Sequence, residues 1–232
     1  MAKQQKNPEI IELARTLRGT PWCEEYERMI SGMLYNPLHP KLLEARHAAR
    51  QVTYRFNNLD PNSGNHEEVG EKQAKLLAEI LGSVGEGTFI EPPFLPDYGC
   101  NVKIGKNCFF NFGLTILDTS LVIIGDRVQM GPGVNIYGAS HETSVLSRIK
   151  FVEFGDVVRI EDDCWIGGGV TILPGVTIGR GTTVGANAVV TKSIPPYSVA
   201  LGAPARVVKK IQSVEEELAD ENNPYRNMPD RA

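Results

Sequence analysis

One histidine stands out as a candidate for chemistry. His141 lies in the polar stretch YGASHETSVLSRIKFVEFGDVVR and is the only histidine after residue 66. Imidazole titrates near neutral pH and often serves as a general base, so His141 is a candidate proton acceptor. A solvated loop histidine without such a role is the alternative, and the residues alone leave both interpretations open.

Two other residue types bear on this chemistry. Glu153 lies in the same stretch, and its carboxylate could orient the imidazole by accepting from its other nitrogen. The cysteines are scattered without a C-x-x-C pair, which predicts neither a zinc site nor a disulfide framework. Cys108 and Cys164 fall at inward-facing positions of the pattern described next, which favours buried thiols over a covalent cysteine mechanism.

The element that must position His141 is a six-residue repeat. Its apolar positions are Tyr98, Ile104, Phe110 and Ile116, then Ile124, Met130 and Ile136, then Ile160, Ile166, Ile172, Ile178, Val184 and Val190. A sustained period of six predicts short strands wound into a coil, with three repeats per triangular turn and each residue stacked on its counterpart eighteen positions away. A sandwich of short strands is the alternative, but sandwich strands are less uniformly spaced.

Glycines and one interruption punctuate the repeat. Glycine often follows its first position, and we expect a turn of unusual φ there; examples are Gly105, Gly125, Gly167, Gly179 and Gly185. The rhythm breaks between Ile136 and Ile160. Because insertions leave a repeat core as loops on the functional face, the loop near 137–158 is where a site is expected, and it carries His141.

The regions outside the coil have a different pattern. Residues 8–82 show helical spacing, with a cap predicted at Asn7-Pro8 and a further helix expected to begin at His39-Pro40, so residues 1–82 are expected to form a helical N-terminal segment. Residues 83–212 form the coil domain, and 213–232 form a C-terminal tail. In that tail we expect a short acidic helix from Ser213 to Glu221, followed by a loosely ordered end.

Composition excludes several classes of protein. The 232-residue chain is 41% hydrophobic and has a net charge of −4 without a long basic run, which favours a globular protein that does not bind nucleic acid. Its start lacks an apolar run of the length of a signal peptide or membrane span. We therefore expect a cytoplasmic protein with no membrane association.

Several segments together resemble the maltose, galactoside and nodulation-type sugar O-acetyltransferases of the hexapeptide-repeat superfamily. They are GMLYNPLHPKLLEAR, EPPFLPDYGCNVKIGKNCFFNFG, the loop around His141, DDCWIGGGVTILPGVTIG and VVTKSIPPYSVALGAPARVVKKI. The repeats alone would specify only the fold. Their combination with the helical N-terminal segment is much more specific.

The resemblance implies a fold, an assembly and a reaction. The fold is a left-handed parallel β-helix with an N-terminal α-helical segment and a short C-terminal helix. The assembly is a homotrimer with active sites between subunits, and the reaction moves an acetyl group from acetyl-CoA to a sugar hydroxyl, without a metal. His141 resembles the catalytic histidine and Asn111 an active-site asparagine. Acceptor contacts are implied for Arg46, Asp97 and Asp118, and acetyl-CoA contacts for Gly168, Ala186, Thr191, Lys192, Arg206 and Lys209.

The charged residues could have purely structural roles, and several positions on the acceptor side of the site differ from the family pattern. Lys192 and Arg206 suit coenzyme A phosphates but could be solvated charges; Arg46, Asp97 and Asp118 could form structural hydrogen bonds or an ion pair. The departures are Asn36 for an aspartate, Pro37 after it, Thr119 for the second aspartate of a pair and Phe109 for a tyrosine. They weaken the inference to a particular acceptor.

The chemistry implied by the resemblance needs a base and an oxyanion site. His141 would take the hydroxyl proton during direct attack on the thioester in one ternary complex. Oxyanion donors would be backbone N–H groups of the WIGGG run or the Asn111 amide.

Three other functions are alternatives to a sugar O-acetyltransferase. An acetyltransferase for a non-sugar acceptor, such as serine or a chloramphenicol-like compound, is the first. A non-catalytic trimeric scaffold is the second. A γ-type carbonic anhydrase is the third, but it needs three zinc-binding histidines and the repeat region holds one.

Overall fold

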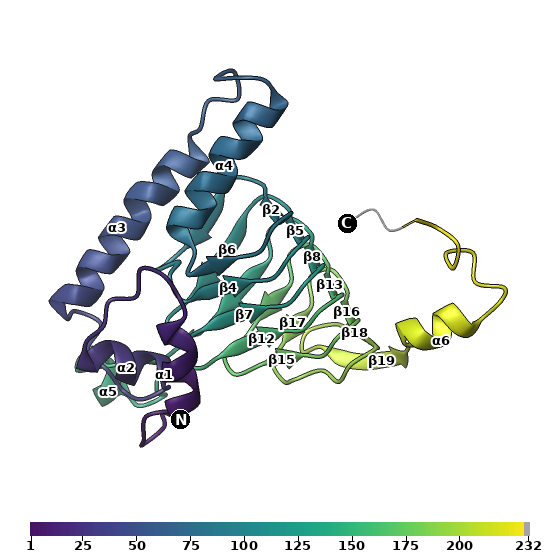
Figure 1. Ribbon diagram of the computed structural model, residues 1–232. Helices are drawn as coiled ribbons and strands as arrows, with labels where there is room; N and C mark the ends of the chain where they lie inside the picture. Colours follow the sequence, from purple (N-terminus) through teal and green to yellow (C-terminus); the bar gives the residue numbers. More distant parts are fainter. Residues whose placement is uncertain (230–232) are drawn as a thin grey trace.

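Short parallel strands form the turns of a triangular coil in the computed structural model, which describes residues 1–229 (Figure 1). The end of the predicted loose tail, residues 230–232, lies outside the described part. Helices lie at the N-terminal end of the coil, and a hairpin and a short helix lie at the other end. The parallel β-helix predicted from the repeat is confirmed, and its left-handed sense stays a prediction.

Each turn of the coil contributes one strand to each of three sheets. The first sheet contains β1 (Ser83–Val84), β4 (Val102–Ile104), β7 (Val122–Ile124), β12 (Val158–Ile160) and β15 (Thr177–Ile178). The second contains β2 (Phe89–Ile90), β5 (Phe109–Phe110), β8 (Gln129–Met130), β13 (Trp165–Ile166), β16 (Thr183–Val184), β18 (Ser198–Leu201) and β19 (Arg206–Lys210). The third contains β3 (Phe94–Pro96), β6 (Leu114–Leu117), β9 (Asn135–Tyr137), β14 (Thr171–Ile172) and β17 (Val189–Val190).

The core consists of columns of inward side chains, one per sheet. In the first sheet Ile160 lies opposite Ile178, at the predicted spacing of eighteen. In earlier turns the spacing is twenty, as between Ile104 and Ile124, because each of these turns holds two more residues in its corners. One predicted column member is wrong: Pro96 lies opposite Ile116, whereas Tyr98 packs in a separate core with the N-terminal helices.

The glycines that follow the first repeat position are needed for space rather than for φ. The expectation of an unusual φ at Gly105, Gly125, Gly167, Gly179 and Gly185 is wrong, because none of them lies in the positive-φ region. Instead, a Cβ added at Gly167 would lie 2.5 Å from the backbone nitrogen of Ala186 in the next turn. Successive turns therefore approach too closely for any side chain at such corners.

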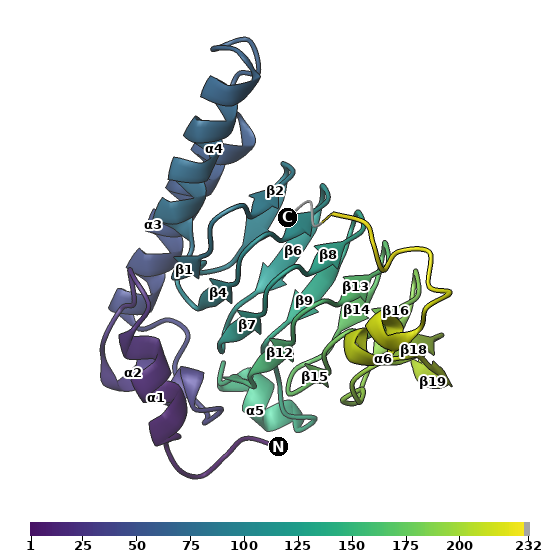
Figure 2. The same cartoon turned by 45° about the vertical axis from the view of Figure 1, so that its right-hand side comes forward.

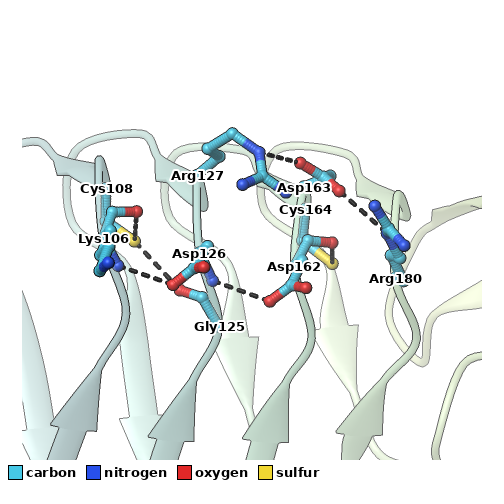
Figure 3. Close-up of polar contacts among 9 residues, drawn as sticks. All are labelled: Lys106, Cys108, Gly125, Asp126, Arg127, Asp162, Asp163, Cys164 and Arg180. Atoms are coloured by element: carbon cyan, nitrogen blue, oxygen red, sulfur yellow. Dashed lines mark hydrogen bonds and ion pairs between the residues drawn. The ribbon is translucent and has the colours of Figure 1, made fainter. Parts of the chain in front are cut away.

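Polar side chains connect the turns at the corner between the first and second sheets (Figure 3). Asp126 Oδ1 accepts from the backbone N–H of Lys106 at 2.8 Å, and Asp162 Oδ1 accepts from that of Asp126 at 2.8 Å. Asp163 accepts from Arg127 Nε at 2.6 Å and from Arg180 Nε at 3.0 Å. The contacts of Asp126 and Asp162 satisfy backbone N–H groups at the corner. The ion pairs of Asp163 connect side chains of successive turns.

The buried thiols at this corner serve the backbone too. Cys108 Sγ donates to the carbonyl of Gly125 at 3.1 Å, and Cys164 Sγ donates to that of Gly179 at 3.2 Å. Burial raises the pKa of both thiols, that of Cys164 to about 12. The prediction of buried, inward-facing thiols at these two positions is confirmed.

The N-terminal segment is helical and forms its own core against the coil. Its helices are α1 (Pro8–Arg15), α2 (Glu24–Ile30), α3 (Pro40–Asn57) and α4 (His66–Ile80). Asn7 caps α1 as predicted, and α3 begins at Pro40, also as predicted. The paired helices α3 and α4 cover the first turns of the coil, and α1 and α2 pack with Tyr98, Cys100 and Leu121 on the side of the coil (Figures 1 and 2).

The insertion and the tail complete the fold. The insertion carries β10 (Ala139–Ser140), α5 (Val145–Ile149) and β11 (Phe154–Gly155), with β10 and β11 paired antiparallel. Helix α5 projects from the side of the coil, near the N-terminus (Figure 2). The predicted acidic helix is α6 (Val214–Ala219), capped by Ser213 and Glu216.

Candidate active site

His141 follows directly after β10 and faces a carboxylate from the other end of the insertion. Its side chain is 56% exposed, and its Nε2 lies 3.6 Å from Glu153 Oε2. Because β10 and β11 pair antiparallel, His141 and Glu153 lie at the same end of this hairpin. The separation exceeds a hydrogen bond, but such contacts in free enzymes are often long and shorten when substrate binds.

Glu153 is held from the side opposite His141. Its side chain is only 18% exposed, and the Tyr35 hydroxyl donates to its Oε1. The backbone N–H of Tyr35 also donates to the Glu153 carbonyl, at 3.1 Å. The structure thus brings together the two residues that the sequence suggested as base and orienting group, and it adds a third that the sequence analysis missed.

The first residues of the chain also contact the insertion. The backbone N–H of Ala2 donates to Glu142 Oε1 at 2.9 Å, and Lys3 Nζ lies 2.8 Å from Asp156 Oδ1. Both partners flank the loop that carries His141. The N-terminal segment therefore holds this loop at its two ends.

Arg46 and Asp97, two of the predicted acceptor-binding residues, lie in one polar cluster. Burial raises the pKa of Asp97, and Glu153 adds to this shift while Arg46 and Arg50 oppose it. Arg46 donates to the carbonyl of Pro37 at 3.1 Å, and its guanidinium lies 5.7 Å from the centre of the Tyr98 ring. Side chains of both signs therefore gather beside Glu153.

Asp118 has a buried position beneath the turn that presents Asp97, and its contact with an acceptor stays a prediction. The residue is fully buried. Its carboxylate accepts from the backbone N–H groups of Tyr98 at 2.8 Å, Asp97 at 3.1 Å and Asn101 at 3.3 Å. Through these three hydrogen bonds Asp118 shapes the turn that presents Asp97. None of its carboxylate surface is exposed.

Two buried polar atoms in this cluster have no hydrogen-bond partner. Within residues 1–229 three such side-chain atoms occur, and two of them are Arg46 Nε and Tyr98 Oη. An unpaired buried polar group costs about 1–3 kcal/mol, so such atoms concentrate where a ligand or water completes the hydrogen bonding. Tyr98 was assigned to the coil core from its six-residue spacing, so the sequence did not reveal its place in this polar cluster.

Two of the departures from the family pattern, Pro37 and Thr119, lie beside the same cluster. Thr119 lies within hydrogen-bonding reach of the Tyr35 hydroxyl, and Pro37 offers its carbonyl to Arg46. Phe109 is on the outer face of the second sheet, stacked on Phe89 at 6.1 Å between ring centres. Two of these departures thus touch the cluster, and Phe109 is on a different face.

Comparison with known proteins identifies the family. The maltose acetyltransferase hexapeptide capping motif matches residues 28–85, and the bacterial transferase hexapeptide repeats match residues 158–192. Nodulation protein L of Rhizobium meliloti is 42% identical over 78% of this chain and 96% of its own length. The chain belongs to the maltose, galactoside and nodulation-type hexapeptide acetyltransferases.

Solved structures of this acetyltransferase family agree with the fold. A maltose O-acetyltransferase from Clostridium difficile 630 is 40% identical, with a TM-score of 0.78 over 82% of this chain and 99% of that one. A galactoside acetyltransferase in complex with coenzyme A is 33% identical, with a TM-score of 0.74 over 84% of this chain and 94% of that one. This chain is therefore an acetyltransferase of the hexapeptide family.

The remaining predicted residues of this acetyltransferase lie at several places on the coil. Asn111, Gly168 and Ala186 all lie at the corner between the second and third sheets, in different turns. His141 and Asp97 lie at the corner between the third and first sheets. One chain therefore does not bring its predicted catalytic asparagine and histidine together.

The other predicted acetyl-CoA-binding residues lie towards the C-terminal end of the coil. Thr191 and Lys192 form the exposed turn after β17. Arg206 and Lys209 are on β19, where they pair with Leu201 and Val199 of β18. All four predicted positions are exposed, as an acetyl-CoA contact requires.

No group of three or more His, Cys, Asp or Glu side chains in residues 1–229 is arranged to hold a metal ion. The same described residues include no helix that is long and apolar enough to cross a membrane.

Proposed function

We propose that this acetyltransferase moves the acetyl group of acetyl-CoA to a hydroxyl of a sugar or sugar-like acceptor, with His141 as general base. The acceptor oxygen attacks the thioester carbonyl, so that a C–O bond forms and the C–S bond breaks. His141 takes the hydroxyl proton and passes it to the departing thiolate, giving an O-acetyl ester and free coenzyme A. The placement of Glu153 beside His141 is the observation that carries this proposal.

His141 fits this role because it is open to solvent on one side and backed by a carboxylate on the other. A base of this kind contributes about 10²- to 10⁴-fold in rate. Glu153 would accept from Nε2–H, which leaves Nδ1 free to receive the acceptor proton. The donors to the oxyanion would be either the backbone N–H groups near Gly168 or the Asn111 amide.

The acetyl-CoA side of the proposal draws on shape and charge. Gly167 and Gly168 lie where the backbones of neighbouring turns come close, so the surface at this corner consists mainly of backbone that an extended ligand could follow. Lys192, Arg206 and Lys209 supply exposed positive charge, which suits the phosphates of coenzyme A. The related galactoside enzyme solved with coenzyme A supports this choice of donor.

A homotrimer with shared active sites is part of the proposal. Asn111 and His141 lie at different corners of one coil, so a site that uses both takes them from two subunits. Large aromatic side chains are uncovered on the second sheet: Phe109 is 42% and Trp165 57% exposed. Threefold packing of coils would bury such surface and bring the two corners together.

The acceptor class rests on the cluster around Arg46, Asp97 and Tyr98. A carboxylate, a guanidinium and an unpaired phenol suit an acceptor with several hydroxyls, because each hydroxyl both donates and accepts. A non-sugar acceptor, such as serine or a chloramphenicol-like compound, is the alternative outcome of the test.

The test is an acceptor screen that measures free coenzyme A release. The panel contains maltose, lactose, glucosamine, serine and chloramphenicol, and we expect turnover with at least one of the three sugars. His141→Ala should lose about three orders of magnitude in kcat while still binding acetyl-CoA in calorimetry. Near-normal turnover by this variant, or a monomer in light scattering, would contradict the proposal.

A further inference from the structure

Tyr35 connects the N-terminal segment to the catalytic loop by two hydrogen bonds to one residue. It is only 2% exposed and lies in the short stretch between α2 and α3. Its hydroxyl donates to the Glu153 carboxylate, and its backbone N–H donates to the Glu153 carbonyl. The side chain and the backbone of Glu153 are therefore both fixed by the same residue from a distant part of the sequence.

The two oxygens of the Glu153 carboxylate have different partners. Oε1 accepts from Tyr35, and Oε2 faces His141 Nε2 at 3.6 Å. A carboxylate that is bound through one oxygen cannot rotate freely, so the hydrogen bond from Tyr35 sets the direction of Oε2. We propose that Tyr35 is a positioning residue for the reaction: through Glu153 it holds the His141 imidazole in the orientation that accepts the substrate proton. This inference rests on the proposed function.

The surroundings make Tyr35 a permanent donor. Burial raises the pKa of its hydroxyl far above the ordinary value, and the charge of Glu153 and the nearby Tyr98 add to this shift, while Thr119 opposes it. The hydroxyl therefore keeps its proton over the whole working range of pH. The other ionisable groups that face this site are Asp97 beside Glu153, and Arg46 and Arg50 beside Asp97.

The chain offers a matched control for removing this hydroxyl. Tyr26 is also fully buried in the N-terminal core, and its hydroxyl donates to Asn101 Oδ1 at 2.9 Å. Tyr26→Phe removes a buried hydrogen bond of the same chemical type without touching Glu153. A loss that comes only from weakened packing of the N-terminal segment would appear equally in Tyr26→Phe and Tyr35→Phe.

The kinetic test is a double-mutant cycle with Glu153→Gln, run with acetyl-CoA and the best acceptor of the screen. We expect Tyr35→Phe to lower kcat about tenfold with the KM for acetyl-CoA unchanged, and Tyr26→Phe to stay within about twofold of the wild type. In the Glu153→Gln background, Tyr35→Phe should have little further effect, because its route to His141 is already broken. Equal losses in both backgrounds would refute the positioning role.

A second measurement needs no acceptor. The chain has four histidines, so nitrogen-15 spectra of labelled protein can be assigned to His141 by comparison with His141→Ala. We expect the wild type to carry the proton on Nε2, and both Tyr35→Phe and Glu153→Gln to shift His141 towards a mixture of the two tautomers. An unchanged spectrum in Tyr35→Phe overturns the inference.

The two proposals fail in different ways. Full turnover by His141→Ala contradicts the proposed function, whatever Tyr35 does. Loss of turnover in His141→Ala together with wild-type kinetics and a wild-type tautomer in Tyr35→Phe overturns the positioning role alone.

Discussion

The Asp118 carboxylate accepts a hydrogen bond of 2.8 Å from the backbone N–H of Tyr98 while both residues are buried. Burial raises the pKa of Asp118 to about 7, although the backbone hydrogen bonds of Tyr98 and Asn101 oppose the shift. This carboxyl thus supports the turn that carries Tyr98, while burial of its charged form costs the folded state free energy.

The first prediction concerns the pH dependence of this support. The unfolded chain has an aspartate pKa of about 3.9, below the folded value, so the folded state binds this proton more tightly. Asp118 contributes its full stability below about pH 4 and loses it as the pH rises through 7. Relative to Asp118→Asn, the wild-type melting temperature should therefore fall from pH 5 to pH 8.5. A constant difference between the two proteins would contradict the raised pKa.

The second prediction concerns a pH effect of opposite sign. Burial alone would raise the pKa of Asp163, but hydrogen bonds from Arg127 and Arg180 lower it overall. Asp163 therefore contributes stability above the unfolded pKa and loses it as the pH falls through its lower folded value.

Because both arginines are over 40% exposed, we expect Asp163→Asn to cost only about 1 kcal/mol at pH 7. Asparagine tolerates the positive φ of this position. The difference should shrink below pH 4 in thermal unfolding. Glu71→Gln, which breaks a fully solvated pair with Lys75 at 3.9 Å, is the control and should change nothing measurable.

The third prediction compares two glycines. Gly167→Ala places a Cβ 2.5 Å from the backbone of Ala186 and should lower the free energy of unfolding by about 2–3 kcal/mol. Gly70 lies within α4 with open space around it, so Gly70→Ala should instead stabilise the protein by about 0.5–1 kcal/mol. Denaturant unfolding of both variants checks the sign, and a stabilised Gly167→Ala would refute the close approach of turns.

The fourth prediction addresses the acetyl-CoA site. Lys192→Ala and Arg206→Ala should each raise the KM for acetyl-CoA several-fold with kcat nearly unchanged, because phosphate contacts bind ground state and transition state alike. The effect should weaken at high salt. Lys75→Ala removes an exposed charge from α4 and should have wild-type kinetics. A fall in kcat without a change in KM would place Lys192 or Arg206 elsewhere in the mechanism.

The repeat pattern predicted the fold well because it reports directly on burial. Each inward Ile or Val, such as Ile160 and Ile178, must stack on a neighbour, so its spacing is visible in the sequence. The extra corner residues of the early turns were missed, since corners carry no hydrophobic signal. Tyr98 was misassigned because an apolar position at the right spacing does not reveal which of two adjoining cores it enters.

The candidate site was only partly predictable from the sequence. His141 and Glu153 were found because the insertion interrupts a regular pattern. Tyr35 was missed because it is in a short non-helical stretch between two helices, with no spacing that links it to residue 153. The hydrogen bonds from backbone amides to Asp118 were not predictable, because a carboxylate in a motif does not show which groups will contact it.

The ends of the coil have a consequence for solubility. Stacked parallel strands resemble a fibril, and an uncovered last turn invites another molecule to add strands by edge pairing. Here α4 contacts β1 at the first turn, and at the last turn β19 reverses direction and places Arg206, Lys209 and Lys210 on the outer edge of the second sheet. Like charges on this edge repel a second copy and disfavour the addition of its strands there.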